Sequence, residues 1–503
     1  MHRHHVPTVL ALSAVLLTLG ACAQVTSTSA STTGTATTPS TATARAAAET
    51  APAPLDPRVA PMLADISAAR IEQTIRTLAA FGTRHTASDT KSDTRGIGAA
   101  RRWIEQQLKD CSARTGGRLQ VTMDAFIEPP GPRLTQPTEL VNVVATLPGA
   151  SAGTPRERVL VVSGHYDSRN SDVMDASGEA PGANDDASGT AAVMAMACAM
   201  ATQRFDATLV FMAVPGEEQG LLGARHWARR ARAQGLNVEG MITNDIVGSS
   251  RGDKGEHDPK RLRLFADGFD PLLRLLVNAN SNSPASEDEA KTNAAIRAQL
   301  QPLAVAGGGE DLPTQQFGRH LKAEGERYLP GFHVDLIQRR DRYLRGGDHL
   351  PFLERGYAAV RFSEPFEDFR HQHQNLRTEN GVVYGDLPEF VDFGYVADVA
   401  RINLVGLATL AWAPSPVKGA RIDARELTND TTLLWAASAD PELAGYRVVW
   451  RRSESQGWEG AKDVGLVTTV TLPLSKDNLI FGVQAVSKSG HASLASYPLP
   501  LSR

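Results

Sequence analysis

Histidine and carboxylate side chains recur in this 503-residue chain where apolar runs end and glycine-containing loops begin. Such side chains bind zinc, or manganese or cobalt in its place. Two adjacent cations repel each other, so they need a shared carboxylate between them. The residues concerned are His165, Asp167, Asp185, Asp186, Glu217, Glu218 and Asp245. Their order favours metal-dependent hydrolysis, with Asp185 suited to lie between two metal ions.

Three apolar runs must position these side chains. Arg158–Ser163 precedes His165, Ala207–Val214 precedes Glu217, and Gly240–Asp245 itself ends on a carboxylate. Short, nearly unbroken apolar runs are typical of strands that helices bury on both faces. The sequence therefore predicts an α/β fold. Its central sheet is mostly parallel (mixed), with helices on both faces and the site at the carboxyl ends of the strands.

Helices are predicted between and around these strands. Gly189–Ala201 is rich in Ala and Met and predicts a buried helix, and Gln219–Gln234 predicts the next one. Helical periodicity also occurs at Ile71–Phe81 and Ile97–Leu108. The polar stretch Ser249–Arg339 is too long for a simple loop, so we expect it to contain helices of its own.

Each motif alone has an ordinary structural explanation, such as a helix cap or a hydrogen-bonded pair, but four in order are harder to dismiss. The segment from about Leu55 to Ala413 resembles the di-zinc aminopeptidases secreted by bacteria, which are relatives of glutamate carboxypeptidase and glutaminyl cyclase. The matching motifs are His-Tyr-Asp-Ser, Gly-Ala-Asn-Asp-Asp-Ala-Ser-Gly, Gly-Glu-Glu-Gln-Gly-Leu-Leu-Gly and Asn-Asp-Ile. The resemblance implies a zinc-dependent aminopeptidase that binds two Zn²⁺ per chain and acts on peptides with a free N-terminus.

The resemblance also implies a role for each motif residue. His165 and Asp245 would hold one zinc, Glu218 and a distant histidine the other, and Asp185 would bridge them. Glu217 would be the general base for a metal-activated water. Asp167 would accept the second ring N–H of His165. In the family the peptide bond after the bridging aspartate is cis, which makes Asp185-Asp186 a candidate for this rare bond.

The distant histidine has three candidates. His371 keeps the family's His-x-x-x-Asp spacing after the predicted strand Ala358–Phe362, although Asn375 stands where the aspartate is usual. We therefore rank His371 first, His373 second and His349 third, with His349 expected to shape the substrate pocket. Tyr343 resembles the family's occasional transition-state hydrogen-bond donor, and an ordinary packed tyrosine is the alternative.

The N-terminal residues predict export. Residues 1–22 combine a charged start, an apolar run from Val9 to Leu19 and the segment Leu19-Gly20-Ala21-Cys22, which resembles a bacterial lipoprotein box. This predicts lipid attachment at Cys22 and anchoring to a membrane of the cell envelope, while a plain secretory signal is the alternative. Residues 23–54 are rich in Ser, Thr and Ala and predict a disordered tether.

Residues 55–414 are the predicted catalytic domain, and residues 415–503 differ from them in pattern. Short alternating strands separated by turn signals resemble a fibronectin type III β-sandwich, with Trp435 in its core and Ser487–Gly490 as the last hairpin turn. The net charge of −4 argues against a nucleic-acid partner. Cys111 and Cys198 could pair, but an inert buried Cys198 is the simpler expectation.

Other functions stay open on the same residues. A carboxypeptidase would need a basic cluster for a substrate carboxylate, which the sequence does not locate. Glutaminyl cyclase resembles a single-zinc site, whereas His165 and Asp245 argue for two ions. A non-catalytic surface-binding lipoprotein is opposed by the complete ligand set and by Glu217.

Overall fold

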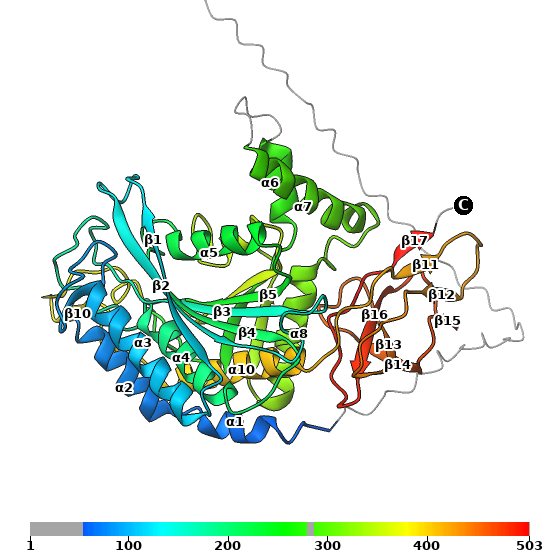
Figure 1. Ribbon diagram of the computed structural model, residues 1–503, viewed down its shortest axis with the longest axis horizontal. Helices are drawn as coiled ribbons and strands as arrows, with labels where there is room; N and C mark the ends of the chain where they lie inside the picture. Colours follow the sequence, from blue (N-terminus) through cyan, green and yellow to red (C-terminus); the bar gives the residue numbers. More distant parts are fainter. Residues whose placement is uncertain (1–53, 279–285, 502–503) are drawn as a thin grey trace, which may run out of the picture. The chain divides into compact units, whose positions relative to one another are not determined.

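The computed structural model describes residues 54–278 and 286–501. An eight-stranded mixed sheet forms its centre, in the order β1-β2-β4-β3-β5-β8-β6-β7 (Figure 1). The strands are β1 (Gln120–Glu128), β2 (Thr138–Leu147), β3 (Val159–His165), β4 (Thr208–Val214), β5 (Val238–Asn244), β6 (Arg261–Phe265), β7 (His333–Ile337) and β8 (Ala359–Ser363). The four middle strands β4, β3, β5 and β8 are parallel, while β1, β2 and β6 join antiparallel. The predicted α/β fold with a mostly parallel, mixed sheet is confirmed.

Helices cover both faces of this sheet (Figure 1). Side chains of β3 alternate between two cores: Leu160 and Val162 belong to one, Val159 and Val161 to the other. This alternation explains why the strand is apolar throughout. The helices are α1 (Val59–Asp65), α2 (Ala68–Ala79), α3 (Gly96–Arg114), α4 (Ala187–Met200), α5 (Leu222–Ala233), α6 (Asp270–Asn278), α7 (Glu287–Val305), α8 (Pro313–Tyr328), α9 (Leu350–Leu353) and α10 (Phe393–Ala411).

The four predicted helices around the motifs are present, with shifted ends. The buried helix after the acidic motif is α4, which starts two residues before the predicted Gly189 because Asp186 caps it and accepts from the Gly189 N–H at 2.9 Å. The polar stretch 249–339 contains α6, α7 and α8, and also β6 and β7 at the sheet edge. Those two strands were not predicted, because their five-residue runs carry charged side chains.

Cys111 of α3 and Cys198 of α4 form a disulfide, with their Cα atoms 5.6 Å apart. The expectation that Cys198 is an inert apolar residue was therefore wrong. Its helix packs directly on α3, and this tertiary contact cannot be read from spacing along the chain. The bond joins two helices on the same face of the sheet.

The C-terminal part contains two small sheets around one apolar core that includes Trp435 and Tyr446. Ser487–Gly490 is a turn, with the Ser487 N–H bonded to the His491 carbonyl. The sheets have the orders β15-β12-β11-β17 and β14-β13-β16, from β11 (Arg421–Asp423), β12 (Thr431–Leu434), β13 (Leu443–Arg451), β14 (Gly460–Gly465), β15 (Thr469–Leu472), β16 (Ile480–Ser487) and β17 (Leu499–Leu501). The fibronectin type III assignment stays a prediction.

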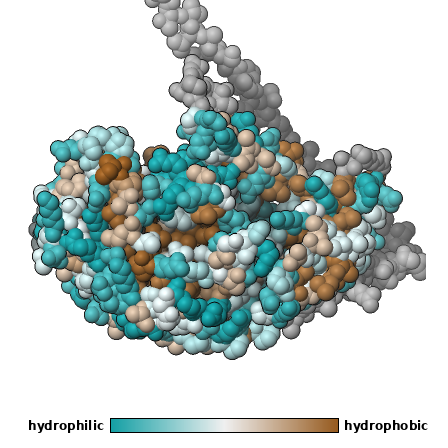
Figure 2. All heavy atoms as spheres, viewed as in Figure 1, coloured by the Kyte–Doolittle hydropathy of each residue, from teal (hydrophilic) through white to brown (hydrophobic). Residues whose placement is uncertain are grey.

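Among the described residues, α10 alone is long and apolar enough to cross a membrane by length and composition. It is 78% buried over its most apolar window, and it packs on α8, α4 and α2 in the core. The face shown in Figure 2 is mainly hydrophilic, with apolar residues exposed in smaller groups. The predicted signal peptide with its Cys22 lipid site, and the tether up to residue 53, lie outside the described residues.

Candidate metal centre

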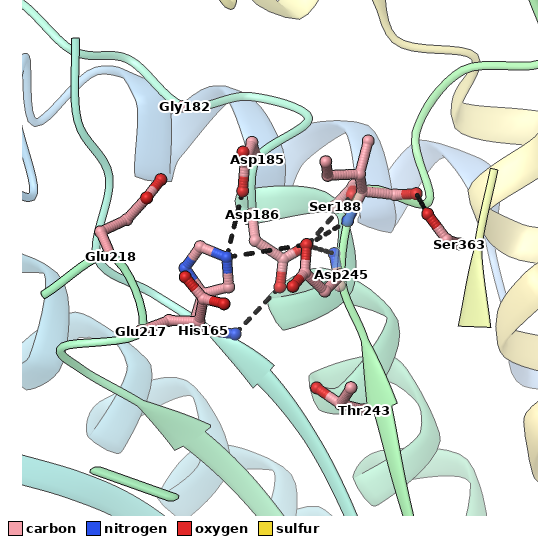
Figure 3. A network of polar contacts seen from close by, with 12 residues as sticks. His165, Gly182, Asp185, Asp186, Ser188, Glu217, Glu218, Thr243, Asp245 and Ser363 are labelled. Atoms are coloured by element: carbon pink, nitrogen blue, oxygen red, sulfur yellow. Dashed lines mark hydrogen bonds and ion pairs between the residues drawn. The ribbon is translucent and has the colours of Figure 1, made fainter. Parts of the chain in front are cut away.

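The motif residues meet at the carboxyl ends of the parallel strands (Figure 3). His165 is the last residue of β3, Asp245 follows β5 directly, and the loop after β4 carries Glu217 and Glu218. Asp185 lies immediately before the capping residue of α4. Three connections that follow the parallel strands β3, β4 and β5 thus converge on one place, as open α/β folds require of their sites.

Two groups of side chains are spaced to hold a metal ion, and Asp185 belongs to both. In the first, His165 Nε2 lies 3.1 Å from Asp185 Oδ1 and 4.0 Å from Asp245 Oδ1. In the second, His373 Nε2 lies 2.8 Å from Asp185 Oδ2 and 2.7 Å from Glu218 Oε1. Asp185 therefore offers one oxygen to each group, which is the arrangement of a bridging ligand.

One feature of the site that hydrogen bonding does not explain is consistent with a bound zinc ion. His165 Nε2 is buried and points among carboxylate oxygens, yet it makes no hydrogen bond. A buried ring nitrogen without a partner is costly unless another group satisfies it. Imidazole nitrogen together with carboxylate oxygen is a donor set that suits Zn²⁺.

Buried carboxylates hold Asp185 and His165 in place. Asp386 accepts hydrogen bonds from the backbone N–H groups of Asn184 and Asp185, each at 2.7 Å. Asp186 accepts from the backbone N–H of His165 at 2.9 Å. The Asp185-Asp186 peptide bond is cis, as the resemblance implied. Asp386 was missed from the sequence, since it lies about 200 residues from the loop that it supports.

Asp167 lies behind His165, whose Nδ1 is 3.2 Å from the Asp167 backbone carbonyl oxygen and 3.4 Å from its Oδ1. Its carboxylate also accepts from the backbone N–H groups of Glu217 at 3.3 Å and Glu218 at 3.2 Å, and from the Thr86 hydroxyl at 3.1 Å. One buried aspartate thus fixes both a histidine and the loop with the two glutamates. Its role is positioning, since nothing in this geometry places it on substrate.

The two adjacent glutamates, Glu217 and Glu218, have different electrostatic surroundings. Burial raises the pKa of Glu217 well above its ordinary value, and the negative charges of Asp245, Glu218 and Asp348 add to this effect. Glu218 instead lies 2.8 Å from the Arg169 guanidinium. A carboxyl group with a raised pKa is suited to accept and return a proton near neutral pH.

Both histidines of the groups have raised pKa values. Burial opposes the shift at His165, but Asp186, Asp167 and Asp185 raise its pKa well above the ordinary value. At His373 burial is also outweighed, and Glu218 and Asp185 raise the pKa to about 9. The carboxylates around the two rings therefore outweigh the cost of burying a positive charge there.

The structure corrects the expected choice among the three histidines. His371 stacks on Phe390 with ring centroids 3.5 Å apart, and its Nδ1 lies 3.5 Å from Asp368, outside both groups. The chain turns at His373, whose φ of +53° is left-handed, and its ring faces Asp185 and Glu218. Spacing along the sequence cannot show such a turn.

The other candidate residues lie outside the two metal groups. His349 Nε2 lies 2.7 Å from the Arg340 carbonyl oxygen, so His349 is in neither metal group. Tyr343 is 83% exposed beneath the Arg339 guanidinium, so it is not an ordinary packed tyrosine, and its role as a hydrogen-bond donor stays a prediction. Asn375 accepts from the Ser171 backbone N–H and hydroxyl.

Two further residues of the site were missed. Arg361 of β8 is fully buried, and its guanidinium lies 2.8 Å from Asp245 Oδ1. A charged residue inside an apolar strand was a usable signal. Asp348 is buried with both carboxylate oxygens unpartnered, and burial raises its pKa to about 7. A Cβ added at the neighbouring Gly347 would lie 3.2 Å from Asp245 Oδ2, which is tighter than an ordinary van der Waals contact.

Comparison with known proteins agrees with this donor set. The model of "Peptidase family M28" matches residues 142–296. A probable zinc metalloprotease of the fungus Leptosphaeria maculans is 46% identical over 449 residues, which cover 89% of this chain and 98% of the relative. Another, from Pyrenophora tritici-repentis, is 44% identical over 449 residues, covering 89% and 88%.

These relatives are fungal, so the bacterial affiliation expected from the motifs is not supported. Among solved structures, the aminopeptidase from Aneurinibacillus sp. strain AM-1 has a TM-score of 0.45 and 15% identity, covering 71% of this chain and 97% of that one. The close fungal relatives cover nearly the whole sequence. This chain therefore belongs to the zinc metalloproteases of peptidase family M28.

Proposed function

We propose that this zinc metalloprotease is an exopeptidase that binds two Zn²⁺ per chain and removes N-terminal residues from peptides. The observation that carries the two-ion proposal is the position of Asp185, which has one oxygen in each group. His165 and Asp245 would hold one ion, and Glu218 and His373 the other. The ions, when bound, would acidify a water molecule and polarise the scissile carbonyl.

Glu217 is the proposed general base. It stands next to Glu218 on the same loop, and its raised pKa suits a group that takes a proton from water and returns it to the leaving amine. Asp167 holds the loop through both backbone N–H groups, so the two glutamates keep separate positions.

The choice of the amino end is supported by the acidic surroundings of Glu217. Asp348 lies beside it, buried and with neither carboxylate oxygen hydrogen-bonded within the described residues, so a substrate's α-ammonium group would donate to it. Carboxypeptidase, glutaminyl cyclase and a non-catalytic role remain the alternatives.

The test compares metal content with turnover. Elemental mass spectrometry should find two zinc ions per chain in the purified protein. Glu217→Gln should keep both ions while turnover falls by ~10²–10⁴-fold. Glu218→Gln should lose zinc instead. One zinc per saturated chain, or equal cleavage of N-acetylated and free peptides, would contradict the proposal.

A further inference from the structure

A pocket of about 600 Å³ opens beside the metal centre. Glu217, Glu218 and His373 line one side of it. Three arginines from separate loops also line it, namely Arg133, Arg169 and Arg345. An arginine fork matches a carboxylate in shape and charge, so three of them in one pocket indicate an anionic group on the ligand.

The positive charge of the Arg133 guanidinium is available to such a ligand. It lies on the loop between β1 and β2 and is exposed. Its Nη1 donates to the Glu218 backbone carbonyl at 2.7 Å, which orients the guanidinium without neutralising it. In the described ranges it makes no ion pair with a carboxylate within 4 Å.

Arg345 also leaves a positive surplus. Its Nη1 lies 3.0 Å from Glu367 Oε2 and 3.3 Å from Gln372 Oε1. Glu367 is shared with two other guanidinium groups, those of Arg263 at 2.8 Å and Arg342 at 3.0 Å. Arg342 has a second carboxylate partner in Asp341 at 3.2 Å, whereas among the described residues Arg263 and Arg345 have Glu367 alone, so Arg345 is only partly neutralised.

Arg169 lies between the metal centre and the pocket. Its Nε donates to Glu218 Oε2 at 2.8 Å, and its Nη2 lies 2.6 Å from His373 Nδ1. Its Nη1 donates to the Asn170 carbonyl oxygen at 3.2 Å, a neutral partner, so this end of the guanidinium can bind an anionic group in the pocket.

We infer that this pocket binds a carboxylate of the substrate through Arg133, Arg169 and Arg345. The inference rests on the proposed function, because it assumes that peptide is cleaved beside Glu217. Leu344, fully exposed, and Phe369, 56% exposed, add apolar surface to the same pocket. The favoured substrates are therefore short apolar peptides whose own C-terminal carboxylate reaches the arginines, or peptides with an acidic side chain there.

Five substrates separate these sources: Leu-Leu, its C-terminal amide, its N-acetyl derivative, and the amide pair Leu-Asp-NH₂ and Leu-Asn-NH₂. For the zinc-loaded protein, kcat/KM should be about 10–100-fold higher for the acid than for the amide, as expected for charge-assisted hydrogen bonds. A preference for Asp over Asn with no acid preference would assign the carboxylate to a side chain. Equal rates in both comparisons would overturn the inference.

Variants connect the preference to the arginines. Arg133→Gln and Arg345→Gln should each bring the acid-to-amide ratio towards 1 without loss of zinc, while Arg204→Gln, exposed and outside the pocket, should keep it. Calorimetric binding of Leu-Leu and its amide to Glu217→Gln gives the same comparison without turnover. An unchanged ratio in both pocket variants would overturn the assignment.

The same experiment keeps the two proposals apart. If N-acetyl-Leu-Leu is cleaved as fast as Leu-Leu while the acid preference holds, the amino-end proposal fails and the arginine assignment stands. If the free peptides are cleaved without acid preference, the amino-end proposal stands and the arginine assignment fails.

Discussion

At the scale of single residues, the centre depends on Asp185 and on what holds it. Its two oxygens face two histidines that lie more than 200 positions apart in the sequence, and the Asp386 carboxylate holds the backbone beneath it. Gln372 adds a contact at 3.3 Å to Asp185 Oδ2. The ligand geometry is therefore set by a few buried polar groups rather than by apolar packing.

Substitutions of His373 and His371 should have opposite effects on zinc binding. His373→Ala should lower zinc affinity by more than the ~10–100-fold typical of losing a partner behind a ligand, because it removes a nitrogen of the second group. Metal content after dialysis and zinc titration by calorimetry measure this.

His371→Ala is the matched control for this prediction. It should keep both ions and cost only the stacking on Phe390, about 0.5–1.5 kcal/mol of unfolding free energy. Loss of zinc from His371→Ala with full binding in His373→Ala would show that the placement of this loop is wrong.

At the scale of elements, the loop before α9 is tied to the loop after β8 by Glu367. This carboxylate joins Arg342 and Arg345 of the first loop to Arg263 of β6. Burial raises the pKa of Glu367, but Arg342, Arg263 and Arg345 outweigh it and lower the pKa to about 2. The pocket wall with Arg345 therefore depends on an ionised Glu367.

This gives a prediction of pH dependence. The pKa of Glu367 in the folded protein lies below the ordinary glutamate value of 4.5, so its stabilising contribution is present above about pH 4.5 and is lost as pH falls towards 2. Glu367→Gln should reduce the unfolding free energy at pH 7 by roughly 3 kcal/mol, with the difference shrinking in acid.

Urea unfolding at several pH values measures the difference. Glu179→Gln provides the control, since Glu179 pairs with Arg95 at a half-exposed site and such pairs contribute little. A difference between Glu367→Gln and wild type that stays constant from pH 7 to pH 3 would contradict the ionic origin.

At the scale of the whole molecule, a buried ion cluster joins the C-terminal sheets to the sheet that carries the site. Asp311, just before α8, binds Arg319 at 3.0 Å and Arg451 of β13 at 2.7 Å, and none of the three is more than 3% exposed. The Tyr497 hydroxyl donates to the Ala306 carbonyl at 2.9 Å. These contacts favour cooperative unfolding of both parts.

Breaking this cluster should therefore destabilise the whole chain. Arg451→Met leaves Asp311 with Arg319 and Gln316 as side-chain partners and should cost about 1.5–3 kcal/mol of unfolding free energy, the range for a lost hydrogen bond to a charged group. Scanning calorimetry should show a lower Tm, with the transition split in two. Arg447→Met, which removes a surface pair with Asp463, should change stability by less than about 1 kcal/mol.

An unchanged Tm in Arg451→Met would contradict the proposed coupling. This prediction does not depend on three expectations that remain predictions from sequence. They are the lipid anchor at Cys22, the export that it implies, and the fibronectin type III assignment.

The sequence by itself determined the parts whose physics is local. Apolar runs of strand length, glycine-containing loops and the side chains that follow them predicted the parallel sheet, α4, and the meeting of His165, Asp185, Glu217, Glu218 and Asp245 at one edge. A strand buried on both faces must be apolar throughout, and its carboxyl end has one position in a parallel sheet. These rules need no knowledge of distant contacts.

Only the tertiary structure decided the parts that depend on distant segments. The left-handed turn at His373 excluded His371, and packing of α3 on α4 brought Cys111 to Cys198. Asp386 and the arginines of the pocket come from loops that no local pattern connects to the motifs. Their positions follow from how separate loops pack at the sheet edge, and the free energy of that packing is not encoded in any single window of sequence.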